Sequence, residues 1–90
     1  LPVQPKNMKL TVTKKEDVSF SFKSPKLESS KIELVYYLGP REQRLEITHL
    51  KTKNDLTTFT TNFKITGFYD VHLKFENDIV ASYVVDVKKS

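Results

Sequence analysis

The chain has 90 residues, of which 38% are hydrophobic and 11% aromatic, and it carries a formal net charge of +4. This length fits one domain with a single modest core and leaves no room for a second domain. Because the chain has no cysteine, a disulfide, a cysteine-ligated zinc site and a cysteine nucleophile are all excluded.

The first seven residues contain two prolines, Pro2 and Pro5, which cannot both serve a sheet ladder. We therefore expect residues 1–7 to be a linker remnant and residues 8–90 to form a single domain. From Met8 onward, apolar and polar residues alternate in seven short segments, and no helical period persists for ten residues. This pattern predicts an all-β chain folded as an antiparallel β-sandwich of about seven strands.

Turn signals separate the predicted strands at Ser24-Pro25, at Gly39-Pro40 and at Asn54-Asp55. In the fifth strand, Phe59, Phe63 and Ile65 are expected to share the inner face. The predicted strands are, in chain order, Met8–Val12, Val18–Phe22, Ile32–Leu38, Leu45–His49, Phe59–Ile65, Phe68–Phe75 and Ile79–Lys88.

The register of the last hairpin follows from the rule that cross-strand partners share a face. A two-residue loop at Asn77-Asp78 would pair Tyr69 with Asp86 and bury a carboxylate without a partner, which is costly. A three-residue loop over residues 76–78 brings apolar residues together instead, so we expect that loop. The expected pairs are Phe75 with Ile79, Leu73 with Ala81, Val71 with Tyr83, and Tyr69 with Val85.

The sixth strand opens on the sequence Gly67-Phe68-Tyr69-Asp70-Val71, in which a Tyr follows a Gly by two residues. This stretch resembles the tyrosine corner of immunoglobulin-like domains. This chain has Phe20 or Phe22 at the position of the first cysteine of that pattern. It has Tyr36 at the position of the tryptophan and Val71 at the position of the second cysteine. The closing hairpin is also similar to filamin-type repeats and to early-set sandwiches. The resemblance implies an immunoglobulin-like fold with Gly67 and Tyr69 as its structural corner, and it carries over no binding residues.

No catalytic residue, metal site or cofactor is predicted. His49 and His72 lie on separate strands, and no acidic residue stands at a metal-ligand spacing from them. The serines lack any nucleophile signature. Lysines and acids are interspersed, and the only arginines are Arg41 and Arg44, so nucleic acid is not an expected partner. No apolar run approaches the roughly 18 to 20 residues of a membrane span, so this chain is not expected to insert directly into a membrane.

The alternation also predicts an apolar outer face on the sheet formed by the third, sixth and seventh strands. The opposite sheet is expected to expose mostly Ser, Thr and Lys. An apolar cluster from three adjacent strands marks a contact surface, although such residues also raise strand propensity without binding anything. The last strand, taken as an edge, is a second place where a peptide strand could add. The predicted face comprises Val35, Tyr37, Phe68, His72, Val80 and Val84.

The leading hypothesis is a non-enzymatic structural or protein-interaction module, one domain of a larger multidomain protein, which contacts a protein partner or neighbouring domains of the same chain. One alternative is a ligand-recognition sandwich, an adhesin or carbohydrate-binding domain with Tyr36, Tyr37 or Tyr83 as a stacking platform. Another is an accessory domain of an enzyme. The sequence does not fix the compartment, and we place the extracellular or luminal face of a membrane-anchored protein ahead of the cytoplasm.

Overall fold

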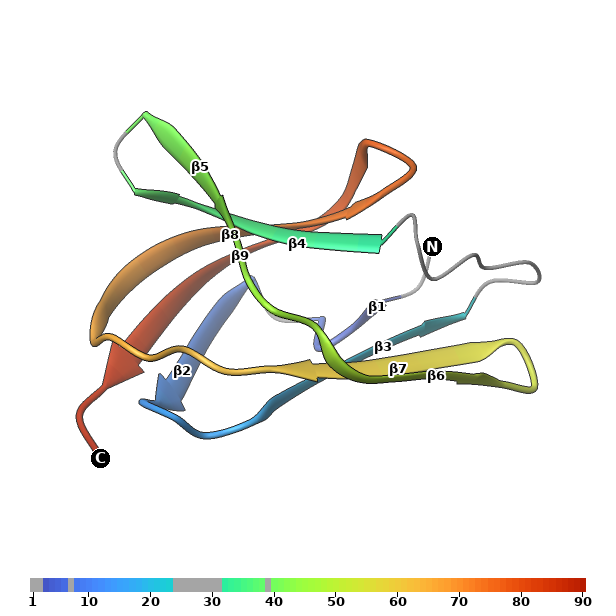
Figure 1. The fold of residues 1–90 in the computed structure, drawn as a ribbon, viewed down its shortest axis with the longest axis horizontal. Coiled ribbons are helices and arrows are strands. Elements are labelled where there is room, and N and C mark those ends of the chain that lie inside the picture. Colours follow the sequence, from blue (N-terminus) through green and yellow to red (C-terminus); the bar gives the residue numbers. More distant parts are fainter. Residues whose placement is uncertain (1–2, 7, 24–31, 39) are drawn as a thin grey trace.

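The chain folds as two β-sheets packed face to face in a computed structural model that describes residues 3–6, 8–23, 32–38 and 40–90 (Figure 1). These residues form nine strands and no helix, which confirms the all-β sandwich with two strands more than expected. The strands are β1 (Val3–Gln4), β2 (Lys9–Thr13), β3 (Val18–Lys23), β4 (Ile32–Leu38), β5 (Arg41–Arg44), β6 (Thr48–Lys53), β7 (Leu56–Thr61), β8 (Gly67–Phe75) and β9 (Asp78–Lys88).

One sheet has four strands in the order β1-β3-β7-β6, and the other has five in the order β2-β9-β8-β4-β5. Neighbouring strands are antiparallel except for β2 and β9, which run parallel. The last strand, β9, therefore lies between β2 and β8 and is not an edge, so the expectation of strand addition at β9 is wrong.

The two strands that the sequence pattern missed are β1 and β5, and the strand expected over Leu45–His49 is displaced, because β6 begins only at Thr48. In β1, Val3 pairs with Phe22 of β3 and is buried, so the described part of the expected linker packs on the sandwich. Strand β5 pairs with β4 at the edge of the five-stranded sheet. Its sequence, Arg41-Glu-Gln-Arg44, has no apolar residue and hence no hydrophobic period that could reveal a strand.

Aromatic side chains from the four-stranded sheet fill the centre of the sandwich. Phe20 stacks on Phe59 with ring centroids 5.4 Å apart, and its other neighbour is the Tyr83 ring, also at 5.4 Å. The five-stranded sheet contributes mainly aliphatic residues to the same core, including Leu34, Leu73 and others that are almost fully buried. This packing holds the two sheets together without a disulfide.

The register of β8 and β9 is as expected away from the turn, where Tyr69 pairs with Val85 and Leu73 with Ala81. Near the turn the expectation is wrong, because Phe75 pairs with Asp78 rather than with Ile79. The turn therefore has two residues, Glu76 and Asn77, with φ values of 52° and 71°. Positive φ at both central positions matches the twist of a two-residue hairpin turn.

A register shift between Leu73 and Lys74 then absorbs one extra residue of β9 as a β-bulge. The bulge changes the direction of two side chains. Ile79, expected inside, is 55% exposed, whereas Val80, expected on the outer face, is half-buried and packs against the core. Val80 is therefore not part of the predicted contact face.

The fifth predicted strand also ends earlier than its pattern indicated. β7 stops at Thr61, and the chain continues as a loop in which Phe63 is buried but Ile65 is 70% exposed. Because the loop breaks the alternation of strand residues, Ile65 does not share the inner face with Phe59 and Phe63. The carbonyl oxygen of Ile65 instead accepts a hydrogen bond from Tyr69, near the start of β8.

Candidate interaction face

The outer face of the five-stranded sheet is the surface that the sequence analysis singled out. Val35, expected to be exposed there, has no exposed surface. Its cross-strand partners are Arg44 on β5 and His72 on β8, whose longer side chains stand on either side of it. Because the sequence pattern did not reveal β5, it could not show that Val35 has a neighbour on that side. Val35 is thus a buried residue and not a contact residue.

Polar and charged side chains form a connected network on this part of the face. Lys74 Nζ lies 3.2 Å from Glu42 Oε1, and the Tyr37 hydroxyl donates a 3.4 Å hydrogen bond to Glu42 Oε2. Arg44 Nη2 lies 3.4 Å from Glu33 Oε2. The network ties β5 to β4 and β8, although exposed ion pairs of this kind contribute only about 0.2 to 1 kcal/mol each.

His72 is also held by its neighbours. Its Nδ1 lies 2.8 Å from Ser82 Oγ, and its Nε2 lies 3.5 Å from Asp70 Oδ1. The Tyr37 ring packs edge-on against the imidazole, with centroids 5.5 Å apart. Tyr37 and His72 therefore belong to a half-buried polar cluster rather than to an exposed apolar surface.

The apolar part of the predicted face is reduced to Phe68 and Val84, which are 74% and 47% exposed. Phe68 is paired with Asp86, and Val84 with Asp70, so the two apolar side chains are diagonal neighbours on adjacent strands. We call these two residues the Phe68 patch. Of the six residues predicted for the face, these are the two apolar residues that are exposed.

The start of β8 has the geometry of a tyrosine corner. The Tyr69 hydroxyl donates a 2.6 Å hydrogen bond to the carbonyl oxygen of Ile65, and its ring contacts Phe63 and Tyr36 at centroid distances of 5.0 and 5.2 Å. Burial raises the pKa of Tyr69, and the nearby Tyr36 hydroxyl raises it further. Gly67 has a φ of 140°, which L side chains rarely adopt.

Replacing Tyr69 by phenylalanine is expected to lower the free energy of unfolding by about 1 kcal/mol, because the Ile65 carbonyl loses its side-chain donor. The urea midpoint of the variant measures this loss. Tyr37→Phe is the matched control, since its exposed hydrogen bond is long at 3.4 Å, and it should leave the midpoint nearly unchanged. Equal urea midpoints for Tyr69→Phe and the unsubstituted chain would show that the hydrogen bond of the corner does not stabilise the domain.

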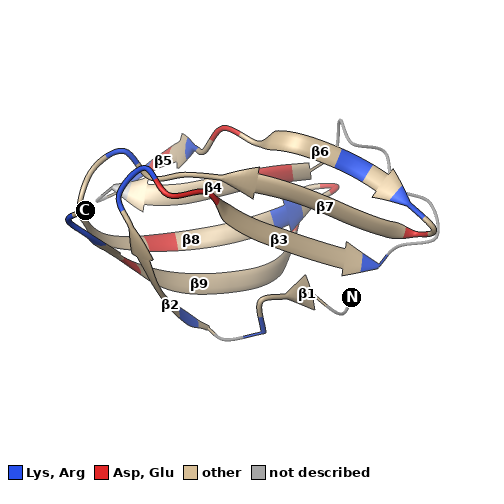
Figure 2. Cartoon of the chain, turned by 90° about the horizontal axis from the view of Figure 1, so that it is seen from below, with Lys and Arg blue, Asp and Glu red and all other residues tan. Residues whose placement is uncertain are grey.

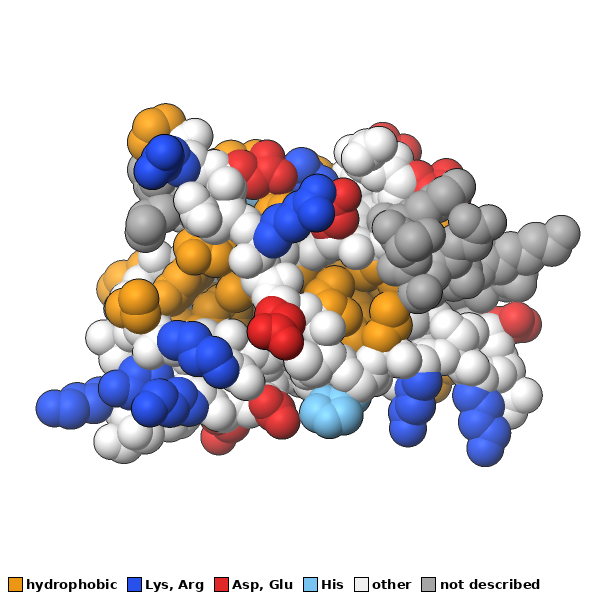
Figure 3. Space-filling view, in the orientation of Figure 1, with side chains coloured by type: hydrophobic (Ala, Val, Ile, Leu, Met, Phe, Trp, Pro, Cys, Tyr) orange, Lys and Arg blue, Asp and Glu red, His pale blue; other side chains and the backbone are white. Residues whose placement is uncertain are grey.

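A cleft of about 380 Å³ opens beside this corner, between the two sheets. Tyr36, Phe63 and Tyr69 line it together with the charged residues Arg44, Glu46 and Lys64. Figure 3 looks into the gap between the sheets and shows hydrophobic side chains on both sides of the segment that joins β5 to β6. The cleft combines aromatic walls with a few polar groups, as small-ligand sites do.

Of the three tyrosines considered as stacking platforms, only Tyr36 lines this cleft. Tyr83 is 3% exposed, and its hydroxyl donates a 2.9 Å hydrogen bond to the carbonyl oxygen of Pro5. Burial also raises the pKa of Tyr83. Tyr37 is engaged with Glu42 and His72.

Within the described residues, no group of three or more His, Cys, Asp or Glu side chains is arranged to hold a metal ion. The two histidines lie on different sheets, His49 on β6 and His72 on β8. The same part of the chain contains no helix of the length and apolarity that would cross a membrane.

No protein-family model matches the chain, and no curated protein matches it. Among solved structures, the chain is similar to the crystal structure of the Lin-41 filamin domain, with a TM-score of 0.66. The alignment covers 97% of this chain and 90% of that chain, at 9% sequence identity. The likeness shows the fold, and it confirms the resemblance to an immunoglobulin-like sandwich of the filamin type.

Proposed function

Starting from this immunoglobulin-like, filamin-type fold, we propose that the chain is a non-enzymatic structural or protein-interaction module, one domain of a larger multidomain protein. The observation that supports this proposal is the Phe68 patch on the outer face of the five-stranded sheet. Phe68 is 74% exposed on a regular strand, where its ring contributes little to the core. Burying such a side chain against a partner contributes about 1.5 to 3 kcal/mol, enough for an anchor residue.

The surroundings of the patch indicate what a partner surface must offer. Asp86 lies opposite Phe68 and is paired with Lys88 at 2.9 Å, whereas the side chain of Asp70 is 63% exposed. A partner that presents an apolar pocket to Phe68 and a basic side chain to Asp70 would match both features. The partner is a protein surface, either a neighbouring domain of the same protein or a separate chain.

Substituting Phe68 with serine, or Val84 with lysine, is expected to weaken partner contact at least tenfold, because each change removes apolar area at the patch. Both residues are exposed, so the free energy of unfolding should change by no more than about 0.5 kcal/mol. Ile79→Lys is the matched control, since Ile79 is 55% exposed at the other end of the sheet. Loss of contact with Ile79→Lys but not with Val84→Lys would move the interface away from the patch.

One observation favours the alternative of ligand recognition, namely that Tyr36 lines the cleft beside the tyrosine corner. Neutral oligosaccharides titrated into the labelled protein would shift the Tyr36 ring signals if the cleft binds sugar, and leave them unchanged otherwise. The third hypothesis, an accessory domain of an enzyme, differs from the first only in the sequence that flanks this domain.

A further inference from the structure

The outer face of the four-stranded sheet is hollowed into a trough, on the side of the molecule opposite the Phe68 patch. One hollow of about 600 Å³ lies across β1, β3, β7 and β6, and a second of about 490 Å³ continues it along β6 and β7. Lys51 and Thr58 line both hollows, so the two form one continuous surface. We call this surface the hydroxyl trough.

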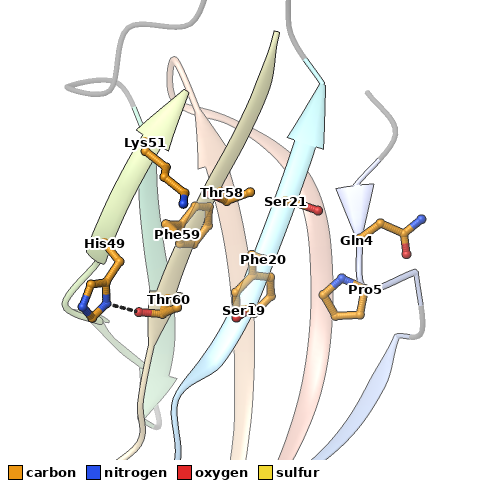
Figure 4. Close-up of a pocket in the computed structure, with 10 residues that line it drawn as sticks. All are labelled: Gln4, Pro5, Ser19, Phe20, Ser21, His49, Lys51, Thr58, Phe59 and Thr60. Atoms are coloured by element: carbon orange, nitrogen blue, oxygen red, sulfur yellow. Dashed lines mark hydrogen bonds between the residues drawn. The ribbon is translucent and has the colours of Figure 1, made fainter. Parts of the chain in front are cut away.

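Short hydroxyl side chains form the floor of the first hollow, whereas the exposed Leu56 lines the second. Ser19 pairs with Thr60 and Ser21 with Thr58 across β3 and β7, so four hydroxyls stand on one face (Figure 4). Gln4 and Pro5 of the β1 segment border the floor on one side, and β6 borders it on the other. No hydrogen bond from another described residue reaches the hydroxyl of Ser19, Ser21 or Thr58, and these three groups are therefore available to a ligand.

An irregularity in β6 directs a histidine toward this floor. The register of β6 and β7 shifts between Thr48 and Lys51, and His49 has a φ of 53°. The Nδ1 of His49 lies 3.0 Å from the hydroxyl oxygen of Thr60, as Figure 4 shows. Bulges re-aim side chains in this way beside functional sites. His49 therefore forms part of the wall, although the sequence pattern grouped it with the apolar positions of its strand.

The charge of the trough is positive. Lys23, Lys51 and Lys53 line it, and Figure 2 shows basic residues on β6 and at the end of β3. Within the described residues no ion pair neutralises these three lysines, and no acidic side chain lines either hollow. Asp55 lies in the turn between β6 and β7, outside both linings. Hydroxyl donors together with unpaired ammonium groups match a ligand that is rich in oxygen and negatively charged.

The floor also distinguishes between two classes of anionic polymer. Single-stranded nucleic acid binds by stacking its bases on exposed aromatic rings. Here the rings beneath the floor, Phe20 and Phe59, are each 1% exposed. Arginine, whose fork reads base edges, is absent from this sheet, because Arg41 and Arg44 lie on β5. Sugar hydroxyls, in contrast, need only hydrogen-bonding partners, which the floor supplies.

We propose that the hydroxyl trough binds an acidic polysaccharide, a chain of sugars that carries sulfate or carboxylate groups. The anionic groups lie against Lys23, Lys51 and Lys53, and the sugar hydroxyls lie on the Ser and Thr floor. This function is additional to the protein contact proposed for the Phe68 patch. Because the two surfaces lie on opposite sheets, a variant in one leaves the other intact.

The test is a titration of the isotopically labelled protein with a sulfated heparin-type octasaccharide, and with a carboxylate-only oligogalacturonate of equal length. Backbone amide shifts are expected at Ser21, His49 and Thr58, and the ligand that binds more tightly identifies the anionic group. The double variant Lys51→Gln/Lys53→Gln should weaken binding about tenfold, because two charge-assisted contacts are lost. Thr58→Val should weaken it about threefold, through the loss of one hydrogen bond.

The control is Lys9→Gln/Lys89→Gln, which removes the same charge from exposed positions outside both hollows and outside the cleft beside Tyr36. This variant should change the dissociation constant by less than about twofold, since well-separated exposed charges contribute little. If both double variants lose affinity equally and Thr58→Val keeps its affinity, binding depends on net charge alone, and the proposal is overturned. Tighter binding of a single-stranded DNA oligomer of matched charge at the same amides would overturn it in favour of nucleic acid.

Discussion

Replacing Phe20 by alanine is expected to lower the free energy of unfolding by about 3 to 5 kcal/mol. Phe20 is 1% exposed, and its ring lies between the rings of Phe59 and Tyr83, each at 5.4 Å. Removing it leaves a cavity where the two sheets meet, and the two neighbouring rings lose their packing partner. Because domains of this size have only about 5 to 13 kcal/mol of stability, the variant should be partly unfolded at moderate temperature.

Urea denaturation followed by circular dichroism measures this effect. Phe20→Leu serves as the control, because it keeps most of the apolar volume and should cost less than about 1.5 kcal/mol. A loss below about 1 kcal/mol for Phe20→Ala would show that the sheets do not meet at this ring.

Replacing Val35 by lysine is expected to destabilise the domain by about 3 kcal/mol or more, because a charge would enter a site with no solvent exposure. The site is also next to Arg44, which would repel the new ammonium group. Val84→Lys is the matched substitution on the same face of the same sheet. There the free energy of unfolding should change by no more than about 0.5 kcal/mol.

Thermal denaturation of the two lysine variants compares these sites directly. Similar melting temperatures for Val35→Lys and Val84→Lys would show that Val35 is open to solvent and that β5 does not cover it. The comparison therefore tests the position of β5, the strand that the hydrophobic pattern did not predict.

The parts of the fold that the sequence predicted are those where alternation is strong. The pairs Leu73–Ala81 and Tyr69–Val85 follow from the need to place apolar residues on one face, and the structure has both. Strand β5 has no apolar residue, and tertiary contacts such as the pair between Lys74 and Glu42 hold it in place. No local pattern encodes such contacts, so the burial of Val35 could not be predicted.

The errors near the last turn have a different cause. The choice between loop lengths assumed a hairpin without irregularities, in which one register holds along the whole pair of strands. The structure instead combines a two-residue turn at Glu76 and Asn77 with a bulge that absorbs Val80. Away from the turn, the strands therefore pair as they would with a three-residue loop. Only Ile79 and Val80 lie on faces opposite to those expected.

The residues of the hydroxyl trough had a visible signal in the sequence. Ser19 and Ser21, Thr58 and Thr60, and Lys51 and Lys53 each recur at a spacing of two, which places the members of each pair on one face of a strand. What the sequence could not supply is the strand order β3-β7-β6, which brings the three pairs side by side. The orientation of the His49 side chain toward these pairs depends on the bulge in β6.

The Phe68 patch is the surface through which we propose that this chain contacts a protein partner. The measurement is a comparison of amide and methyl NMR spectra of this chain alone, at rising concentration, and then with the segment that flanks it in the proposed multidomain protein. We expect shifts confined to Phe68, Asp70 and Val84, and we expect Val84→Lys to abolish them. Shifts that are absent from these residues, or that persist in the Val84→Lys variant, would contradict the claim.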